Sequence, residues 1–362
     1  MRICRVSFAP ITQIFEQIPQ RDHHLLSRLK RCGHDVHDLR IAPVWRPMAL
    51  RLSYLAGLLR ATPYLSCVKA DLILADGVEA GLVGWIAART KRIPFVFDYR
   101  DHYSFLYRQQ RDWRNPVVVK VLERWLPKVA DLSIVVDGRQ YRACLLAGAS
   151  TDRVKVVSNG ADPDRFAPGP KDSAFLAEWG LTDRPVILYI GKMTSAFNLP
   201  MAVEAMQTVV KAHTRACLVC VGDGPALADL RSLSQKLGLE RHVIFAGHCS
   251  YDRIPALIRS SDICVYPLRS VAALAIFEYM ACGKPVVVPN ADYDLSLPEG
   301  SCLSVEKSVQ GFAEGISHLL REPPLCDRIG RTAREFVATQ HSWDQLARTY
   351  EAALMDLVKG WG

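Results

Sequence analysis

The feature that most constrains this fold is a pair of apolar runs that do not alternate with polar residues. Residues 263–265 and 286–288 are such runs, and β-branched side chains dominate both. Runs of this kind are typical of parallel strands that helices cover on both faces. The residues between them carry apolar side chains on one helical face, and Gly283 and Pro285 end that helix before the second strand. The stretch therefore predicts a strand–helix–strand unit of an α/β fold.

The same alternation of strands and helices extends along the chain. It predicts doubly wound parallel sheets, in which ligands bind at the carboxyl ends of the strands. A length of 362 residues is long for one core and suits two such domains. Asn159 and Gly160 predict a turn at the end of a strand, in the middle part of the chain. In the first half we expect a helix at residues 22–32 and strands at 3–8, 34–39, 71–75, 94–98 and 131–136.

Apolar runs and cysteines bound the class of protein. No run reaches the roughly 18 apolar residues of a membrane-spanning helix. The N-terminus has the pattern of a strand, not of a secretory signal. Eleven cysteines, an odd number without such a signal, indicate reduced thiols and a cytoplasmic protein. Cys217 and Cys220 have the spacing of a metal-binding pair, but they lie in an apolar strand with no second pair nearby, so we expect them in the core and predict no metal site.

The positive charge of the chain is concentrated in its first half. Residues 1–165 hold 26 Lys and Arg against 16 Asp and Glu, whereas residues 166–362 hold 19 against 21. A basic first half indicates an anionic partner, and nucleic acid, an anionic membrane surface and a phosphorylated acceptor all fit. We rank nucleic acid last, because no motif combines aromatic and basic residues. Residues 47–65 have a basic and apolar helical pattern, which fits either a membrane-surface helix or a helix packed on its own sheet.

A dense group of titratable residues follows the strongest strand pattern of the first half. It contains Arg100, Asp101 and His102. Such a group at a strand end is a candidate site. The alternative is a solvated loop with local ion pairs.

Two strand ends of the second half carry residues that suit a phosphate. Gly191 permits close approach of a ligand, and the neighbouring Lys192 can balance a diphosphate. Gly222, Asp223 and Gly224 form a turn between a strand and a helix, which alone is only a weak indication of a phosphate or base site.

Glu278 is a carboxylate inside the otherwise apolar helix pattern that precedes residues 286–288. One hypothesis is that it caps or favours the positive end of that helix. The other is that it faces a crevice at the carboxyl ends of the strands and accepts hydrogen bonds from the hydroxyl groups of a ligand.

Residues 278–287, Glu-Tyr-Met-Ala-Cys-Gly-Lys-Pro-Val-Val, resemble the nucleotide-sugar site of the retaining glycosyltransferases of family four, also called glycosyl transferases group 1. Residues 222–225 and 245–248 resemble the segments that flank the nucleobase in that family. The resemblance implies the GT-B fold, in which two Rossmann-like domains face each other across a cleft. The implied domains are an acceptor domain at 1–168, a donor domain at 169–335, and a final helix at 336–362 that crosses back to the first domain.

The resemblance also implies roles for single residues. Glu278 would hold the ribose hydroxyls of the donor, and Lys192 would balance its diphosphate. Arg100, Asp101 and His102 would face the acceptor and the phosphates. The implied donor-binding residues are Gly191, Lys192, Gly222, Asp223, Gly224, His248, Ser270, Leu274 and Glu278.

The donor-sugar part of the sequence departs from the family pattern. Ser270 stands where the first glutamate of the family's pair is expected, and Ala275 stands where a lysine is common. Phe197 replaces a second phosphate-binding lysine, and residues 9–12, Ala-Pro-Ile-Thr, replace a pair of glycines. The motif is thus degenerate, and losing a charged ligand contact typically costs a few kcal/mol of binding.

The leading hypothesis is a retaining, metal-independent glycosyltransferase. It would move a sugar from a UDP-sugar or GDP-sugar to a glycan or lipid-linked acceptor, without a cofactor. The alternative is a catalytically degenerate GT-B protein that serves as a binding or scaffold subunit. A sugar-nucleotide epimerase on the same fold is a third hypothesis. We expect a cytoplasmic location, with peripheral contact at the inner face of an anionic membrane as an extension, and no nucleic-acid partner.

Overall fold

The computed structural model describes residues 1–8, 20–41, 64–65, 67–104, 116–267, 273–290 and 297–361. Contacts divide the chain into unit 1, Met1–Ser158 with Trp343–Gly362, and unit 2, Asn159–Ser342. Ser270, residues 9–12 and nearly all of 47–65, on which sequence predictions rest, lie outside the described residues. The units are separated after Ser158 and after Ser342, whereas the sequence predicts domain boundaries after residues 168 and 335, and these boundaries remain a prediction.

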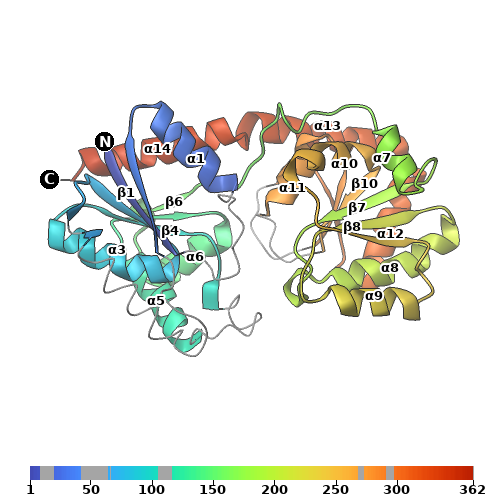
Figure 1. Cartoon of the computed structure of the whole chain (residues 1–362), viewed down its shortest axis with the longest axis horizontal. Coiled ribbons are helices and arrows are strands. Elements are labelled where there is room, and N and C mark those ends of the chain that lie inside the picture. Colours follow the sequence, from blue (N-terminus) through green and yellow to red (C-terminus); the bar gives the residue numbers. More distant parts are fainter. Residues whose placement is uncertain are drawn as a thin grey trace. The chain divides into compact units, whose positions relative to one another are not determined.

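Unit 1 is built on one parallel six-stranded sheet with the strand order β2-β1-β3-β4-β5-β6. The strands are β1 (Arg2–Phe8), β2 (Asp35–Ile41), β3 (Leu72–Asp76), β4 (Phe95–Tyr99), β5 (Leu132–Val135) and β6 (Val154–Val156). The helices are α1 (Gln20–Arg31), α3 (Gly77–Lys91), α5 (Pro116–Val129), α6 (Gly138–Leu146) and α14 (Trp343–Lys359). Figure 1 shows α1 and α14 on one side of this sheet and α3, α5 and α6 on the other. On the first side, the ring of His24 in α1 stacks on Trp343 of α14 with 5.1 Å between centroids.

Unit 2 contains a second parallel six-stranded sheet, with the order β12-β11-β10-β7-β8-β9. The strands are β7 (Val186–Ile190), β8 (Cys217–Val221), β9 (Val243–Gly247), β10 (Ile263–Val265), β11 (Val286–Pro289) and β12 (Leu303–Val305). The α-helices are α7 (Ser173–Glu178), α8 (Leu199–Ala212), α9 (Leu227–Lys236), α10 (Ile254–Ser260), α11 (Leu274–Ala281), α12 (Val309–Arg321) and α13 (Pro323–Gln340). Within this unit, α7, α10, α11 and α13 lie on one side of the sheet, and α8, α9 and α12 lie on the other (Figure 1).

The unbroken apolar runs form buried strands, as the sequence predicts. Every residue of β4, β8, β10 and β11 is buried. Cys217 and Cys220 are 0% exposed in the core of unit 2, which confirms the expectation that they pack there. Because the strands of each sheet are parallel, their carboxyl ends meet at one edge, where the polar residues that follow them gather.

The segment between β10 and β11 forms the expected helix, α11, and ends as predicted. Gly283 has a φ of 70° and adopts the left-handed conformation that a helix C-terminus commonly needs. In the part of the chain that is described, no helix combines the length and apolar character that crossing a membrane requires.

Candidate functional site

The carboxyl ends of β7, β8 and β9 are joined by backbone hydrogen bonds. The N–H of Gly191 donates to the carbonyl of Val221 at 3.0 Å, and the N–H of Gly222 donates to the carbonyl of Gly247 at 2.8 Å. The N–H of Met193 donates to the carbonyl of Asp223 at 2.9 Å. The structure therefore brings the predicted residues of these three strand ends together at one edge of unit 2.

Glycine is required at this edge because two loops touch each other. A Cβ on Gly222 would lie 2.0 Å from the carbonyl oxygen of Gly191, and a Cβ on Gly224 would lie 2.3 Å from that of Met193. Gly222 has a φ of 132° and Gly224 has a φ of 158°, which residues with a side chain rarely adopt. The glycine turn therefore packs against the loop that carries Lys192.

The charged side chains at this edge are open to solvent. Lys192 is exposed, and its ammonium group has no hydrogen-bond or carboxylate partner among the described residues. The loop below it is held by the hydroxyl of Tyr189, which donates to the carbonyl of Lys192 at 3.0 Å. Asp223 and His248 are also exposed. His248 lines a pocket of about 420 Å³ together with Trp179 and Arg253.

Glu278 is 6% exposed in α11 and does not cap the helix. The residue at the N-cap is Ala273, without a side-chain cap bond. Instead, the hydroxyl of Tyr251 donates to Oε1 of Glu278 at 2.7 Å. Burial raises the pKa of Glu278 to about 7, although the Tyr251 hydrogen bond and the charge of Arg165 act in the opposite direction.

Helix α11 is tied to the strand end that carries Gly191. The N–H of Ile190, the last residue of β7, donates to the hydroxyl of Tyr279 at 2.5 Å. Leu274, at the start of the same helix, is half-buried. The helix that carries Glu278 thus contacts β7, the strand that ends before Gly191, while the Glu278 carboxylate itself faces Tyr251.

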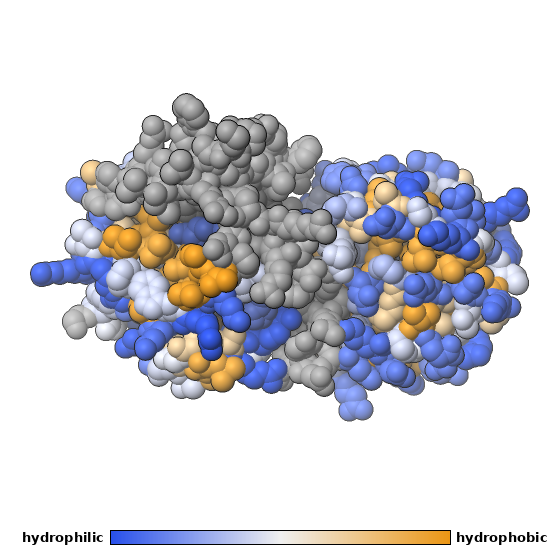
Figure 2. Space-filling view, turned by 90° about the horizontal axis from the view of Figure 1, so that it is seen from below, coloured by the Kyte–Doolittle hydropathy of each residue, from blue (hydrophilic) through white to orange (hydrophobic). Residues whose placement is uncertain are grey.

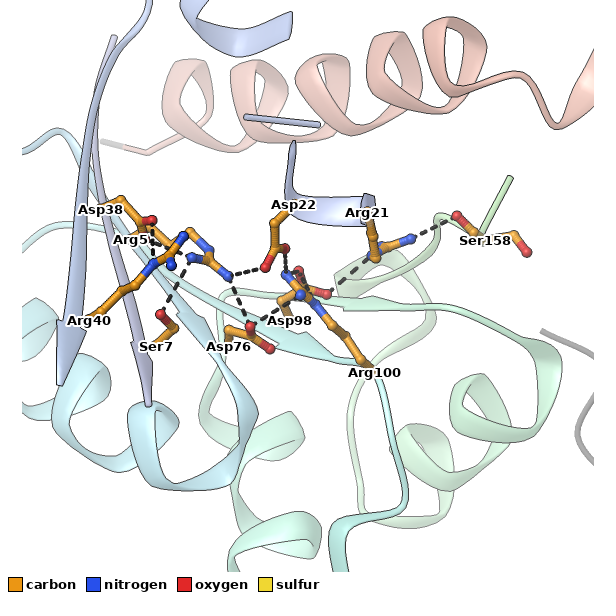
Figure 3. Close-up of polar contacts among 10 residues, drawn as sticks. All are labelled: Arg5, Ser7, Arg21, Asp22, Asp38, Arg40, Asp76, Asp98, Arg100 and Ser158. Atoms are coloured by element: carbon orange, nitrogen blue, oxygen red, sulfur yellow. Dashed lines mark hydrogen bonds and ion pairs between the residues drawn. The ribbon is translucent and has the colours of Figure 1, made fainter. Parts of the chain in front are cut away.

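Unit 1 carries a network of arginines and aspartates at the carboxyl ends of its strands, which we call the Arg5–Arg100 cluster (Figure 3). The Arg5 guanidinium, 2% exposed, binds Asp22 and Asp38 at 2.6 Å and Asp76 at 3.0 Å. The residues of the cluster are Arg5, Ser7, Arg21, Asp22, Asp38, Arg40, Asp76, Asp98, Arg100 and Ser158.

Arg100 contacts three carboxylates of this cluster. Its guanidinium lies 2.6 Å from Asp22, 3.1 Å from Asp76 and 2.7 Å from Asp98. Burial disfavours its charge, but these carboxylates outweigh burial and raise the pKa of Arg100 well above its usual value. The carbonyl of Arg100 accepts a hydrogen bond from the side chain of Gln140 at 2.6 Å. The residue predicted to face ligands is therefore engaged with other residues of unit 1.

Two carboxylates, those of Asp22 and Asp76, contact both arginines, but their pKa values shift in opposite directions. Burial raises the pKa of Asp76 to about 6, although Arg100 and Arg5 act to lower it. Burial acts in the same direction on Asp22, but there the charges of Arg100 and Arg5 prevail, and the pKa is lowered. The charges of Asp22 and Asp76 therefore depend on the two guanidinium groups.

His102 and Asp101 lie beside this cluster in different environments. Asp101 is exposed, whereas burial and the charge of Arg139 lower the pKa of His102, so that its ring is neutral near pH 7. Nδ1 of His102 lies 3.0 Å from the hydroxyl of Tyr99. Its Nε2 is buried and has no hydrogen-bond partner in the described part of the chain.

Sequence reasoning missed several residues that the structure connects to the predicted ones. Tyr251 and Arg165 lie far from Glu278 in sequence, and no local pattern indicates their contact. Arg5 did leave a signal, because it is a charge inside the first strand. Asp76 left the same signal as Arg100, since it ends a buried strand. Among the described residues, no group of three or more His, Cys, Asp and Glu side chains has an arrangement that could hold a metal ion.

Two family models match the chain in succession. The model of glycosyl transferases group 1 matches residues 174–336, and that of the glycosyl transferase 4-like domain matches residues 12–160. Together they place the chain in the group 1 glycosyltransferases, whose GT-B fold its two parallel sheets display.

Individual relatives are distant. The chain is 29% identical over 213 residues to the GDP-mannose-dependent α-(1-6)-phosphatidylinositol monomannoside mannosyltransferase of Mycobacterium tuberculosis; the match covers 56% of this chain and 54% of the relative, about half of its length. It is 25% identical over 350 residues to the 2-deoxystreptamine glucosyltransferase of Streptomyces kanamyceticus, covering 91% of this chain and 82% of that one.

Solved structures agree on the fold. Anabaena HepE, in complex with UDP and glucose, matches with a TM-score of 0.79 and 20% identity, covering 98% of this chain and 100% of HepE. Sucrose-phosphate synthase from Thermosynechococcus elongatus matches with a TM-score of 0.79 and 18% identity, covering 98% of this chain and 99% of that enzyme. At these identities the likeness concerns the fold alone.

Proposed function

We propose that this protein is a retaining glycosyltransferase that moves a sugar from a nucleoside-diphosphate sugar to a hydroxyl group of an acceptor. The observation that carries the proposal is the glycine junction of unit 2, where Gly191 and Gly222 meet beside the exposed Lys192. Relatives support the donor class: HepE is solved with UDP-glucose, and the mycobacterial relative uses GDP-mannose by name. We therefore propose UDP-sugars and GDP-sugars as donors.

The residues of unit 2 have roles in this proposal that follow from their chemistry. The Lys192 ammonium would neutralise the diphosphate as the bond between the anomeric carbon and the phosphate oxygen breaks. The acceptor oxygen would form its bond to the same face of the sugar, and its proton would pass to the departing diphosphate. Glu278 would accept hydrogen bonds from ribose, and Gly222 to Gly224 with His248 would border the base. Ser270 and Leu274 would lie near the donor sugar.

In unit 1 we propose that Asp101 and His102 contact the acceptor. His102 is neutral and has a buried Nε2 without a partner among the described residues, so it suits a hydroxyl group. Arg100 would act indirectly, because three aspartates of unit 1, from α1, β3 and β4, already contact its guanidinium.

Calorimetric titration with UDP and GDP tests the donor site. We expect one of them to bind and Lys192→Met to weaken binding by about tenfold or more. A hydrogen bond to a charged group typically contributes about 1.5–3 kcal/mol, and about 1.4 kcal/mol corresponds to a tenfold change in affinity. Lys211→Met is the matched control, because Lys211 is an exposed lysine in the last turn of α8. Transfer of the sugar from the matching donor then tests the enzyme.

The alternative function is a binding or scaffold subunit with a degenerate donor site, favoured by Ser270 and Ala275 in the sequence. Wild-type protein that binds neither nucleotide would support this alternative and contradict the proposal. If the protein binds a nucleotide but neither transfers the sugar to an acceptor nor hydrolyses the donor, the result would support a regulatory binding subunit instead.

We also propose a cytoplasmic location with peripheral contact to an anionic membrane, through the outward face of α5. Val117, Val118 and Val121 are 66%, 55% and 60% exposed on this face. Its charged residues Lys120, Arg124 and Lys128 are exposed as well, and Figure 2 shows apolar and hydrophilic side chains mixed on this side of unit 1.

The charge of this face fits anionic lipid. The one acidic residue of α5, Glu123, is 8% exposed and faces inward, where its carboxylate accepts hydrogen bonds from the N–H of Ser104 and the hydroxyl of Tyr99. Exposed valines beside three cations combine the apolar and electrostatic contributions that bind interfacial helices to anionic membranes. Cosedimentation with vesicles of anionic and of zwitterionic lipid tests this contact.

A further inference from the structure

The Glu278 carboxylate is held by residues from two other segments of unit 2. Tyr251, the first residue of the 3-10 turn Tyr251–Arg253, donates its hydroxyl to Oε1 of Glu278 at 2.7 Å. The guanidinium carbon of Arg165 lies 4.4 Å above the centre of the Tyr251 ring, which is a cation–π contact. A carboxylate, a tyrosine and an arginine thus form one connected chain of contacts.

The tyrosine in this chain is fixed from several sides. The ring of Phe166 contacts the Tyr251 ring edge-on, with 5.8 Å between centroids. The Arg165 guanidinium that covers the ring also binds the carboxylate of Asp252 at 2.6 Å. Burial and the neighbouring Glu278 carboxylate raise the pKa of Tyr251 well above its usual value. The hydroxyl therefore keeps its proton and acts as the donor toward Glu278.

The charge of Glu278 depends on these contacts, because burial alone opposes it. Burial is the largest influence and raises the pKa to about 7, while the Tyr251 hydroxyl and the Arg165 charge stabilise the carboxylate. Cys282, the residue that follows α11, interacts electrostatically with Glu278. The charges of Arg259 in α10, of Lys284 and of the Arg334 guanidinium in α13 act on the same thiol. That guanidinium donates to the carbonyl of Ala281 at 2.9 Å.

We infer that Tyr251 is a positioning residue for the nucleotide: it holds Glu278 in one rotamer and in its ionised form, so that the carboxylate can accept the two ribose hydroxyls. This inference rests on the proposed function. Tyr251 occupies Oε1 with one hydrogen bond, and a carboxylate offers about four acceptor positions on its two oxygens. A protonated carboxyl would lose part of that capacity, so nucleotide binding should require the ionised form.

The test compares nucleotide binding across pH for the wild type, Tyr251→Phe and Glu278→Gln. Calorimetry with UDP or GDP, whichever binds, is run from pH 5.5 to 9 in buffers of different ionisation enthalpy, which counts the protons released. The Glu278→Gln variant, which has no carboxyl group at this position, measures the protons that the nucleotide itself releases on binding. After that correction, wild-type affinity should rise with pH and have its midpoint near the Glu278 pKa of about 7.

Tyr251→Phe should move this midpoint upward by about one pH unit, because it removes one hydrogen bond to the charged form. Affinity at pH 7 should then fall roughly fivefold and recover at pH 9, since only the ionised fraction changes. Tyr279→Phe is the matched control. It also removes a buried tyrosine hydroxyl, but this hydroxyl accepts a hydrogen bond from Ile190 and does not contact Glu278, so the midpoint should not move. Arg165→Gln should shift the midpoint upward as well, and supplies a second variant if Tyr251→Phe folds poorly.

The outcomes separate this inference from the proposed function. Wild-type protein that binds no nucleotide at any pH would overturn the proposed function and the inference with it. Nucleotide binding whose pH profile is the same in the wild type and in Tyr251→Phe would overturn the inference alone. A uniform loss of affinity at all pH values in Tyr251→Phe would also overturn it, because that result indicates a structural role without an effect on the charge of Glu278.

Discussion

Replacing Arg100 by methionine should destabilise unit 1 strongly, because Arg100 is a partner of three carboxylates. The guanidinium of Arg100, 14% exposed, contacts the carboxylates of Asp22, Asp76 and Asp98 at 2.6–3.1 Å. Methionine fills a similar volume but leaves these three charges beside one another. Arg5 remains in contact with Asp22 and Asp76, and Arg21 lies 3.9 Å from Asp98. Breaking a buried ion pair by removing one partner typically costs about 3–5 kcal/mol. For a unit of this size, about 2–4 °C is lost per kcal/mol, so we expect a shift of about 10 °C.

Scanning calorimetry of the full chain measures this shift, with Arg2→Met as the matched control. Arg2 also forms an arginine–aspartate pair, at 2.6 Å from Asp71, but the two side chains are 48% and 29% exposed. Such exposed pairs contribute about 0–1 kcal/mol, so the control should melt close to the wild type. Hydrogen exchange should further show lost protection in β1, β3 and β4, the strands around the cluster.

One result would refute this reasoning. If Arg100→Met melts within about 2 °C of Arg2→Met and loses only ligand binding or transfer, then Arg100 faces a ligand in the working protein. The role that the family resemblance implies for Arg100 would then hold directly, and its three aspartate contacts would be secondary.

Two further predictions concern the glycine junction and the α5 face. Gly222→Ala should destabilise unit 2 by about 3 kcal/mol or more in a urea titration and abolish nucleotide binding, because its Cβ would lie 2.0 Å from the Gly191 carbonyl oxygen. Gly238→Ala is the control: Gly238 has a positive φ but no atom within 4 Å of an added Cβ, so the change should cost only about 1–2 kcal/mol in the same titration. Replacing Val118 and Val121 by serine should weaken cosedimentation with anionic vesicles by about tenfold, since each buried methylene contributes about 0.8 kcal/mol. Val156→Ser, an exposed valine on the edge strand β6, should bind these vesicles like the wild type, and equal binding to zwitterionic vesicles would contradict the proposed contact.

The fold could be predicted from the sequence because its signal is local. Unbroken apolar runs, glycines at helix ends and alternation of the two patterns each depend on a few consecutive residues. The meeting of Gly191 and Gly222 could be predicted for the same reason. Each glycine directly follows a strand, and parallel strands bring their carboxyl ends together.

The environment of single side chains could not be predicted, because it depends on residues far away in the sequence. Glu278 was open to two hypotheses, capping or ligand contact, and its actual partner is the hydroxyl of Tyr251, on another segment. Arg100 was expected to face ligands or form local ion pairs. One partner, Asp98, is indeed local, but Asp22 and Asp76 come from α1 and β3. Pairings of this kind require the strand order, which composition and spacing do not reveal.

The structure also shows where the positive charge of the first half of the chain lies. At the carboxyl edge of unit 1, the arginines of the Arg5–Arg100 cluster are matched by Asp22, Asp38, Asp76 and Asp98, so this edge adds little net charge. The cations of α5, by contrast, are exposed, and the one acidic residue of that helix is buried. Among the described residues, an anionic partner of unit 1 would therefore find more open positive charge on this outer helix than at the strand ends. The acceptor hydroxyl that we propose beside His102 needs no such charge, so a basic unit 1 is compatible with a neutral acceptor group.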